Sequence, residues 1–254
     1  MALLDVVDVG VRFGGVVALD GLSFKIAPGE ICALIGPNGA GKTTLFNVVS
    51  RLYQPTSGQV HFDGHDLLTL APHQISGKGI ARTFQNLALV PGLSVLENVM
   101  VGAHSVTRGG FWQAATWLTQ RRQERVTRSR ANDTLEQLGL LALAPRPCAG
   151  LPFGTLKRIE LARALMSDPK LLLLDEPASG LTHSEVDELA GVIRSISDSN
   201  ELSVLLVEHH MGMVMSISDR VVVMDLGKKI AEGAPTDIQN DRRVIAAYLG
   251  EDAE

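Results

Sequence analysis

A glycine-rich loop near the N-terminus constrains the fold more than any other part of this 254-residue sequence. Residues 36–43 read GPNGAGKT and fit the spacing G-x-x-x-x-G-K-[ST], between a strand-like run at 31–35 and a helical run at 45–52. Glycines let several backbone N–H groups face one anion, and the following helix presents its positive end. The pattern therefore predicts a phosphate-binding loop; a plain glycine turn is the alternative, and the matching flanks argue against it.

The side chains of this loop suit a nucleoside triphosphate. Lys42 can reach the β- and γ-phosphates, and the Thr43 hydroxyl can take one position around a magnesium ion. The loop alone does not say what the nucleotide is used for. The residues predicted to bind it are Gly36, Pro37, Asn38, Gly39, Ala40, Gly41, Lys42, Thr43 and Thr44.

A second motif, which is acidic, follows an apolar strand-like run. Residues 171–174 read LLLL, and Asp175, Glu176 and Pro177 come directly after them. In doubly wound sheets, ligands bind at the carboxyl ends of the strands. An aspartate there can hold magnesium, and a neighbouring glutamate can polarise an attacking water molecule. Two solvated acids in a turn are the alternative, which would be preferred if the phosphate loop were missing.

The order of strand-like and helical runs predicts an α/β fold. Continuous apolar strands alternate with helical stretches, which indicates a parallel sheet with crossover helices, while the first third contains antiparallel strand candidates. We therefore predict a P-loop NTPase core with an N-terminal antiparallel β part and an inserted α-helical subdomain. The core comprises residues 1–87 and 156–254, and the subdomain comprises residues 88–155.

Composition excludes several classes of function. The net charge of −5 gives no field for nucleic acid, and two cysteines, Cys32 and Cys148, are too few for a disulfide framework. The chain contains no run of about 18 apolar residues, and its first residues are not a secretory leader. We expect a reducing cytosol and buried packing for Cys32. Any connection to a membrane would have to come through a partner.

Further motifs resemble those of the ATP-binding subunits of ABC transporters, in the same order. The resemblance implies that Phe13 stacks on adenine and that Gln85 contacts the magnesium and γ-phosphate region. It also implies that His209 orients the attacking water, with the adjacent His210 as the competing candidate, and that Glu176 is the base. With Thr43 and Gln85, Asp175 would hold magnesium. The alternative interpretation of Phe13 is that it is an ordinary residue of the apolar core.

Residues 151–155, LPFGT, stand where this family has its LSGGQ signature. The resemblance implies that Leu151, Pro152, Phe153, Gly154 and Thr155 face the ATP held by a second subunit. The match is partial, because only Leu151 and Gly154 agree. The sequence predicts that Thr155 opens the helix that follows. The resemblance also implies that residues 178–182, ASGLT, lie at the interface between the two subunits. Within this segment Thr182 replaces the family's usual aspartate.

Almost the whole chain is similar to one ATPase subunit of the branched-chain amino acid importers. KGIARTFQN, LSVLENVMVGAH, EPASGL, VEHHM and the C-terminal AAYLGE carry this likeness. It implies a second, homologous ATP-binding subunit, two membrane permeases, indirectly a substrate-binding protein, and a peripheral location on the cytoplasmic face of the cell membrane. Urea or amide cargo, or a weakly hydrolysing regulatory subunit, are the alternatives. A chromosomal ATPase is disfavoured, because the segment between Lys42 and Gly154 lacks a long coiled coil. A ribosomal ATPase is disfavoured, because such members carry two ATPase cores in one chain and this sequence has one.

Two amphipathic stretches remain. Residues 110–130 contain both tryptophans and a run of arginines, which suits either a helix on anionic lipid or a helix packed on protein with a solvated basic face. The interleaved polar residues favour the second interpretation. Residues 241–250, DRRVIAAYLG, predict a helix that docks on the sheet or on a partner.

Overall fold

The structure, a computed structural model, describes residues 2–83, 87–105 and 117–249. Its centre is a six-stranded sheet with the order β10-β9-β3-β8-β7-β6, in which β10 is antiparallel to β9 and the other neighbours are parallel. Every residue of β3, β7 and β8 is buried, as their apolar runs predict, and the polar residues Asp175 and Ser203 at the strand ends are buried with them. The strands are β3 (Ile31–Ile35), β6 (Ile80–Arg82), β7 (Leu171–Asp175), β8 (Ser203–Val207), β9 (Arg220–Asp225) and β10 (Lys228–Gly233).

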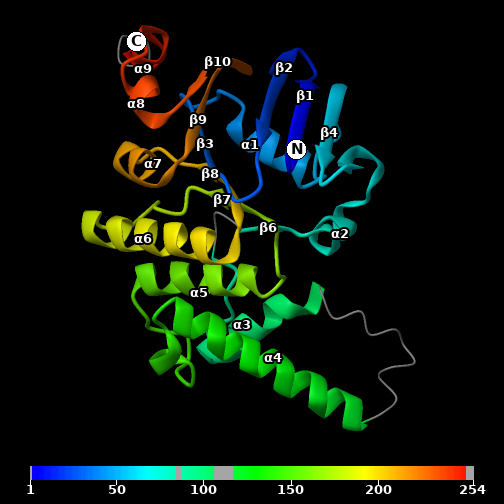
Figure 1. The fold of residues 1–254 in the computed structure, drawn as a ribbon, viewed down its shortest axis with the longest axis vertical. Helices are drawn as coiled ribbons and strands as arrows, with labels where there is room; N and C mark the ends of the chain where they lie inside the picture. Colours follow the sequence, from blue (N-terminus) through cyan, green and yellow to red (C-terminus); the bar gives the residue numbers. More distant parts are fainter. Residues whose placement is uncertain (1, 84–86, 106–116, 250–254) are drawn as a thin grey trace.

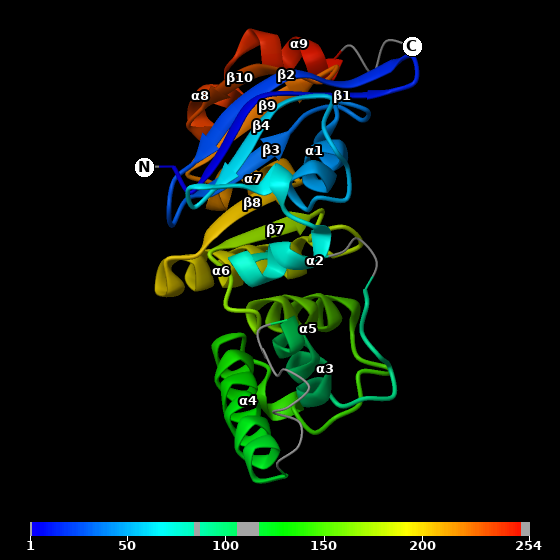
Figure 2. The ribbon, with the colours of Figure 1, turned by 90° about the vertical axis from the view of Figure 1, so that its right-hand side faces the viewer.

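A second sheet confirms the predicted antiparallel β part. It has the order β2-β1-β4-β5, and Leu4 of β1 pairs with Ile26 of β2 on one side and with Phe62 of β4 on the other. Helix α1 lies between this sheet and the parallel one, and its Leu45 and Phe46 are fully buried in the core that the two sheets share (Figure 2). The elements are β1 (Leu4–Phe13), β2 (Val16–Ile26), α1 (Lys42–Val49), β4 (Ser57–Phe62) and β5 (His65–Asp66).

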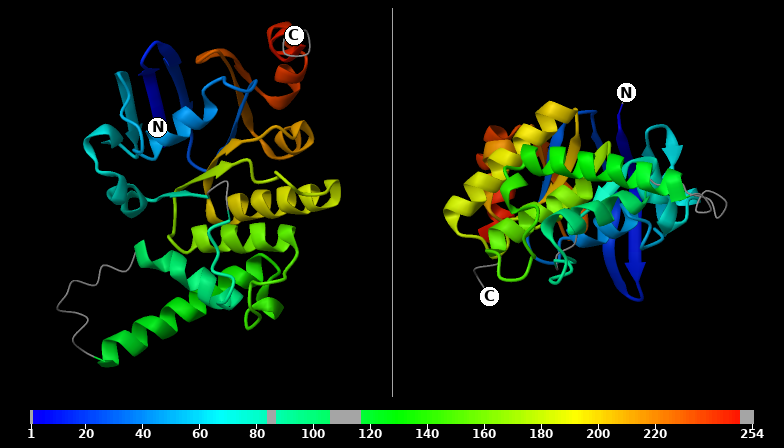
Figure 3. Two further views of the ribbon diagram at one scale, coloured as in Figure 1. Left: turned by 180° about the vertical axis from the view of Figure 1, so that it is seen from behind. Right: turned by 90° about the horizontal axis from the view of Figure 1, so that it is seen from below.

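Most of the longer helices lie on the opposite face of the parallel sheet. Helix α6 lies nearest the sheet, α5 follows, and α3 and α4 lie farthest from the antiparallel sheet (Figures 1 and 3). One apolar core runs through all these layers, with Leu174 of β7, Ile193 of α6, Ile159 of α5 and Leu135 of α4 among its members. The helices are α3 (Val95–Val101), α4 (Trp117–Gln137), α5 (Phe153–Leu165), α6 (His183–Asn200) and α7 (Met211–Ile217), with the short turns α2 (Pro72–Ile75), η1 (Leu67–Thr69), η2 (Ser76–Lys78), η3 (Gly102–Ser105) and η5 (Leu141–Leu143).

One prediction about the helices is wrong, and another can be compared with the structure over only part of its length. The prediction that Thr155 opens a helix is wrong, because α5 begins two residues earlier, at Phe153. Pro152 stands at the N-cap with φ −55°, a value that the proline ring fixes and that leads directly into a helical turn. Within the stretch 110–130, α4 begins at Trp117, and residues 110–116 lie outside the described part of the chain. The boundaries 88 and 155 of the helical subdomain stay a prediction.

The C-terminal stretch packs on its own sheet. Helices α8 (Pro235–Gln239) and α9 (Arg242–Leu249) follow β10. Val244 of α9 belongs to the apolar cluster that includes Ile35 of β3 and Val221 of β9, and Tyr248 packs against the same cluster. The sequence allowed this helix to dock either on the sheet or on a partner, and in the structure it packs on the sheet. In the ranges that the structure describes, the helices are all too short or too polar to cross a membrane.

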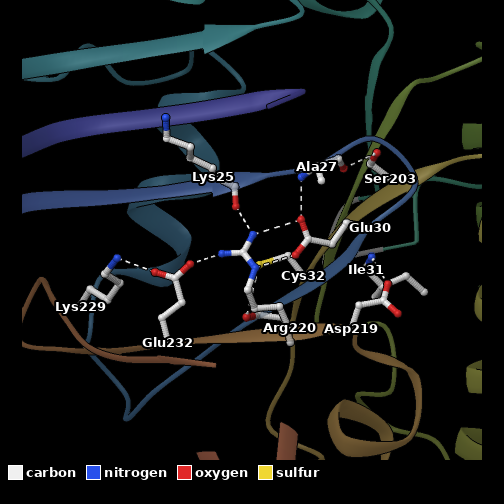
Figure 4. Close-up of polar contacts among 11 residues, drawn as sticks. Lys25, Ala27, Glu30, Ile31, Cys32, Ser203, Asp219, Arg220, Lys229 and Glu232 are labelled. Carbon is white, nitrogen blue, oxygen red and sulfur yellow. Dashed lines mark hydrogen bonds and ion pairs between the residues drawn. The ribbon is translucent and has the colours of Figure 1, made fainter. Parts of the chain in front are cut away.

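A network around Arg220 fastens β9 and β10 to the turn that precedes β3 (Figure 4). The Arg220 Nε donates a hydrogen bond of 2.6 Å to Glu30 Oε1, and its guanidinium also contacts Glu232 and the carbonyl oxygen of Lys25. The hydrogen bonds to Glu30 raise the pKa of Arg220 above its usual range. Glu30 Oε2 in turn accepts a 2.6 Å bond from the Ala27 N–H. Because Lys25 belongs to β2, the network also links the parallel sheet to the antiparallel one.

Both cysteines are buried, so neither thiol is expected to react in the folded protein. Burial raises the pKa of Cys32 to about 12, and burial also raises the pKa of Cys148, which is 2% exposed. Because the thiolate is the reactive form, both remain unmodified by iodoacetamide at pH 8. Mass spectrometry should show no adduct on the native chain and two adducts after unfolding in guanidinium. Rapid labelling of Cys32 in the native protein would contradict the buried position of β3.

Candidate functional site

The predicted site residues gather where the parallel strands β3, β7 and β8 end. The loop 36–41 follows β3, Asp175 ends β7, and the segment 208–210 follows β8 (Figure 1). These three strands are neighbours in the sheet, since β8 pairs with both β3 and β7. The parallel register thus places the loop 36–41, Asp175 and the segment 208–210 at one edge of the sheet, although they are far apart in the sequence.

The loop 36–41 has a shape that only glycine permits at two positions. Gly36 has φ +150°, and a β-carbon there would lie 2.0 Å from the carbonyl oxygen of Met224. Gly41 has φ +99° at the N-cap of α1, and its β-carbon would lie 2.4 Å from the Ala18 carbonyl oxygen. The tight approach to β9 and β2 therefore fixes the path of the loop before the helix begins.

Lys42 lies in the first turn of α1 and holds this loop closed. Its ammonium group donates hydrogen bonds of 2.5 Å to the Gly36 carbonyl and 2.8 Å to the Pro37 carbonyl, and the residue is only 6% exposed. The neighbouring Thr43 is exposed, so its hydroxyl is accessible. A buried cation beside a curled loop and a helix N-terminus is an arrangement that favours a phosphate group.

Asp175 is held by an arginine that the sequence alone did not suggest. Arg82 of β6 forms a 3.0 Å ion pair with Asp175 Oδ2 and donates a 2.7 Å hydrogen bond to Asn47 of α1. The pair is largely buried, and the guanidinium also lies over the ring of Phe46. Arg82 thereby connects the strand that leads to Gln85, the helix after the phosphate loop, and the acidic strand end. Gln85 itself lies outside the described residues.

Glu176 and His209 are in direct contact. The Glu176 Oε1 lies 2.9 Å from His209 Nε2, and the Glu176 N–H donates a 2.8 Å bond to the Val207 carbonyl. Glu176 has φ +47°, a left-handed conformation that turns its side chain away from the strand direction. His210 faces elsewhere: its Nδ1 accepts a bond from the Met213 N–H at the start of α7. Of the two candidate histidines, the structure therefore brings His209 to the carboxylate.

Segment 151–155 meets segment 178–182 at the start of α5. Pro152 supplies no capping oxygen, and a β-carbon on Gly154 would lie 2.7 Å from Glu185 Oε1, so the Glu185 carboxylate packs directly against the first turn. The same carboxylate accepts bonds from the Thr182 N–H at 2.9 Å and the Thr182 hydroxyl at 2.8 Å. These bonds lower the pKa of Glu185. Thr182 thus helps to begin α6 in place of the expected aspartate.

Phe153 and Phe13 are both exposed aromatic residues. Phe153 is 44% exposed, and its ring packs on Gly180, where a β-carbon would lie 3.1 Å from the ring. Phe13 is 47% exposed at the end of β1, and its ring makes an edge-to-face contact with Tyr53 at a centroid distance of 5.2 Å. An exposed ring is not an ordinary core residue, which was the alternative considered for Phe13. Tyr53 was not predicted from the sequence.

The fold and the residues at this edge define a P-loop ATPase, and comparison with known proteins narrows the class. A family model described as "ABC transporter" matches residues 19–179. A second model, "Branched-chain amino acid ATP-binding cassette transporter", matches residues 228–254. The chain belongs to the ABC transporter family and is its ATP-binding, ATP-hydrolysing subunit.

Curated relatives cover nearly the full length. The high-affinity branched-chain amino acid transport ATP-binding protein BraF of Pseudomonas aeruginosa is 41% identical over 251 residues, which is 98% of each chain. The corresponding protein LivG of Escherichia coli is 40% identical over 250 residues, again 98% of each chain. A solved ADP-bound ATP-binding cassette of an ABC transporter superposes with a TM-score of 0.85 at 29% identity, covering 98% of this chain and 99% of the other. The sequence resemblance is therefore confirmed.

Proposed function

We propose that this subunit powers the import of branched-chain or other hydrophobic amino acids. The observation that carries the proposal is the 40–41% identity, over 98% of both chains, to ATP-binding proteins named for high-affinity branched-chain amino acid transport. The match of the C-terminal residues 228–254 to the branched-chain model supports the same cargo. In such an importer the subunit would sit at the cytoplasmic face of the membrane, attached to two permeases that receive amino acids from a binding protein.

Hydrolysis is assigned to the contact between Glu176 and His209. In the proposed mechanism, the Glu176 carboxylate accepts a proton from the attacking water as that water approaches the γ-phosphate. His209 keeps the carboxylate in place through the 2.9 Å contact and orients the water. Lys42 and the backbone N–H groups of residues 36–44, apart from Pro37, which has none, hold the β- and γ-phosphates, and Phe13 stacks on the adenine. The exposed Phe13 ring and the buried Lys42 ammonium support these roles.

Magnesium fits the oxygen donors of this edge. Thr43 offers a hydroxyl in the first turn of α1 and Asp175 a carboxylate at the end of β7, and hard oxygen ligands are what magnesium prefers. We include Gln85 as a third ligand from the family pattern. When bound, the ion supplies charge that stabilises the transferring phosphoryl group. Arg82 holds Asp175 in position for this task.

The signature segment is proposed to serve a second subunit. Figures 1 and 2 show α1 and α5 on opposite faces of the parallel sheet, so the two helix N-termini belong to different surfaces. Leu151, Pro152, Phe153, Gly154 and Thr155 would face the nucleotide of a homologous subunit, and each ATP would be bound between two chains. ATP favours the closed pair because only there does it contact both surfaces. Residues 88–155 would carry this movement to the permeases.

The cargo assignment is tested by uptake of labelled amino acids. A strain lacking this gene should lose most high-affinity uptake of leucine, isoleucine and valine, and the wild-type gene should restore it. The matched control is the same gene with Glu176→Gln, expressed to the same level, which should not restore uptake because hydrolysis drives transport. Normal leucine uptake in the deletion strain, together with lost uptake of urea or amides, would contradict the proposal and identify urea or amides as the cargo.

A further inference from the structure

A buried carboxylate joins the two segments that carry the proposed chemistry. Glu208 directly follows β8 and is only 3% exposed. Its Oε1 accepts a 2.7 Å hydrogen bond from the Ala178 N–H. Its Oε2 accepts bonds of 2.8 Å from the His209 N–H and 3.0 Å from the His210 N–H. One side chain thus connects the segment after β7 with the segment after β8.

The chemistry of this position is specific to a carboxylate. Three backbone N–H groups point at one side chain, and a carboxylate offers acceptors on both oxygens without a donor. A glutamine of the same shape would keep one carbonyl oxygen for His209 and His210. Its NH₂ group would then face the Ala178 N–H, so two donors would meet and that connection would be lost. A buried N–H group without an acceptor is unfavourable, so this position strongly prefers a carboxylate side chain.

The connection joins a surface to the reacting groups. On one side, Ala178 opens segment 178–182, in which Gly180 supports the Phe153 ring and Thr182 bonds with Glu185 at the start of α5. This is the surface proposed to meet the second subunit. On the other side, the two amides that Glu208 holds belong to the segment whose His209 ring contacts Glu176.

We propose that Glu208 is a positioning residue that couples segment 178–182 to His209, so that hydrolysis responds to the docking of the second subunit. A displacement of segment 178–182 on docking is passed through Ala178 and Glu208 to the backbone of His209, and from there to the ring beside Glu176. The inference rests on the proposed two-subunit mechanism. In this proposal Glu208 acts only through the three backbone N–H groups that it holds.

Steady-state ATPase kinetics of the full chain, alone and co-purified with its membrane subunits, test the role. Glu208→Gln should lower kcat about tenfold, because small displacements of reacting groups reduce rates steeply. KM for ATP should stay within about twofold, since the phosphate loop is untouched. Glu208→Ala should behave like Glu208→Gln. If Glu208→Gln keeps the wild-type kcat while Glu208→Ala loses it, the residue only fills space and the proposal fails.

Hydrogen exchange tests the same connection without activity. In Glu208→Gln the Ala178 amide should exchange faster, while the Glu176 amide, which bonds to the Val207 carbonyl, stays protected. Equal exchange at Ala178 in both proteins would overturn the proposal. Ser197→Ala is the matched control, because it removes another buried hydrogen bond, from Ser197 Oγ to the Leu202 carbonyl, away from both segments. It should leave kcat unchanged.

A parallel measurement on Glu176→Gln separates this inference from the proposed function. If Glu176→Gln hydrolyses ATP at the wild-type rate, the proposed mechanism is wrong and the coupling falls with it. If Glu176→Gln is inactive and Glu208→Gln is normal, only the coupling role of Glu208 is refuted.

Discussion

Glu176→Gln is expected to abolish ATP hydrolysis while ATP binding persists. Glutamine has the shape of glutamate, and its carbonyl oxygen can still accept a hydrogen bond from His209 at the place of the 2.9 Å contact. It cannot accept a proton from water, and loss of a general base lowers rates about 10²–10⁴-fold. Product formation stops while both binding surfaces remain, so the variant should accumulate as a closed, ATP-bound pair of subunits.

Two measurements check this result. Phosphate release should fall to the background of the assay, and size-exclusion chromatography with ATP should show a dimer or, with the partner subunit present, a heterodimer. Glu201→Gln is a suitable control, because this exposed carboxylate lies at the end of α6 remote from segment 178–182. Hydrolysis at the wild-type rate in Glu176→Gln would exclude Glu176 as the base.

Lys42→Ala is expected to remove most of the affinity for ATP. The ammonium group is the one charged side chain of the loop 36–43, and its loss takes away a charge-assisted contact with the phosphates. It also leaves the Gly36 and Pro37 carbonyls without the donor that now holds the loop closed. Together these losses should weaken binding about 100-fold, which corresponds to about 2.7 kcal/mol.

Isothermal titration with ATP in the presence of magnesium measures this effect directly. Lys170→Ala serves as the control, because Lys170 is an exposed lysine paired with Asp63 at 2.6 Å and has no place in the phosphate loop. An unchanged dissociation constant in Lys42→Ala would mean that the loop has been misassigned. A thermal melt of both variants would separate lost affinity from lost stability.

The parts of the site that the sequence predicted are those with local signals. The phosphate loop is contiguous, and its glycines, lysine and flanking elements all lie within about one strand and one helical turn of each other. Asp175 and Glu176 were found because they end an apolar strand. The antiparallel β part and the parallel core could be predicted for the same reason, because each strand is a short local run bounded by turn residues, and the parallel strands are continuous apolar runs.

Other features depend on which strands are neighbours, and no local pattern reports that. Arg82 contacts Asp175 only because β6 lies beside β7, and Glu208 reaches Ala178 only because β8 lies beside β7. The partners of Glu208 are backbone groups, which leave no residue type to recognise. A visible hint was the acid directly after a buried strand, in VLLVEHH. The prediction that α5 starts at Thr155 was wrong because Pro152, with its fixed φ, already leads into the first helical turn at Phe153.

The close contact between α3 and α5 has a mechanical consequence. A β-carbon on Gly102, directly after α3, would lie 1.9 Å from the Arg163 carbonyl oxygen, so the two backbones touch with no side chain between them. Arg163 lies in the last turn of α5, whereas Phe153 and Gly154 lie in its first. A displacement of α3 would therefore press directly on the backbone of α5 in its last turn, at the end opposite Phe153 and Gly154.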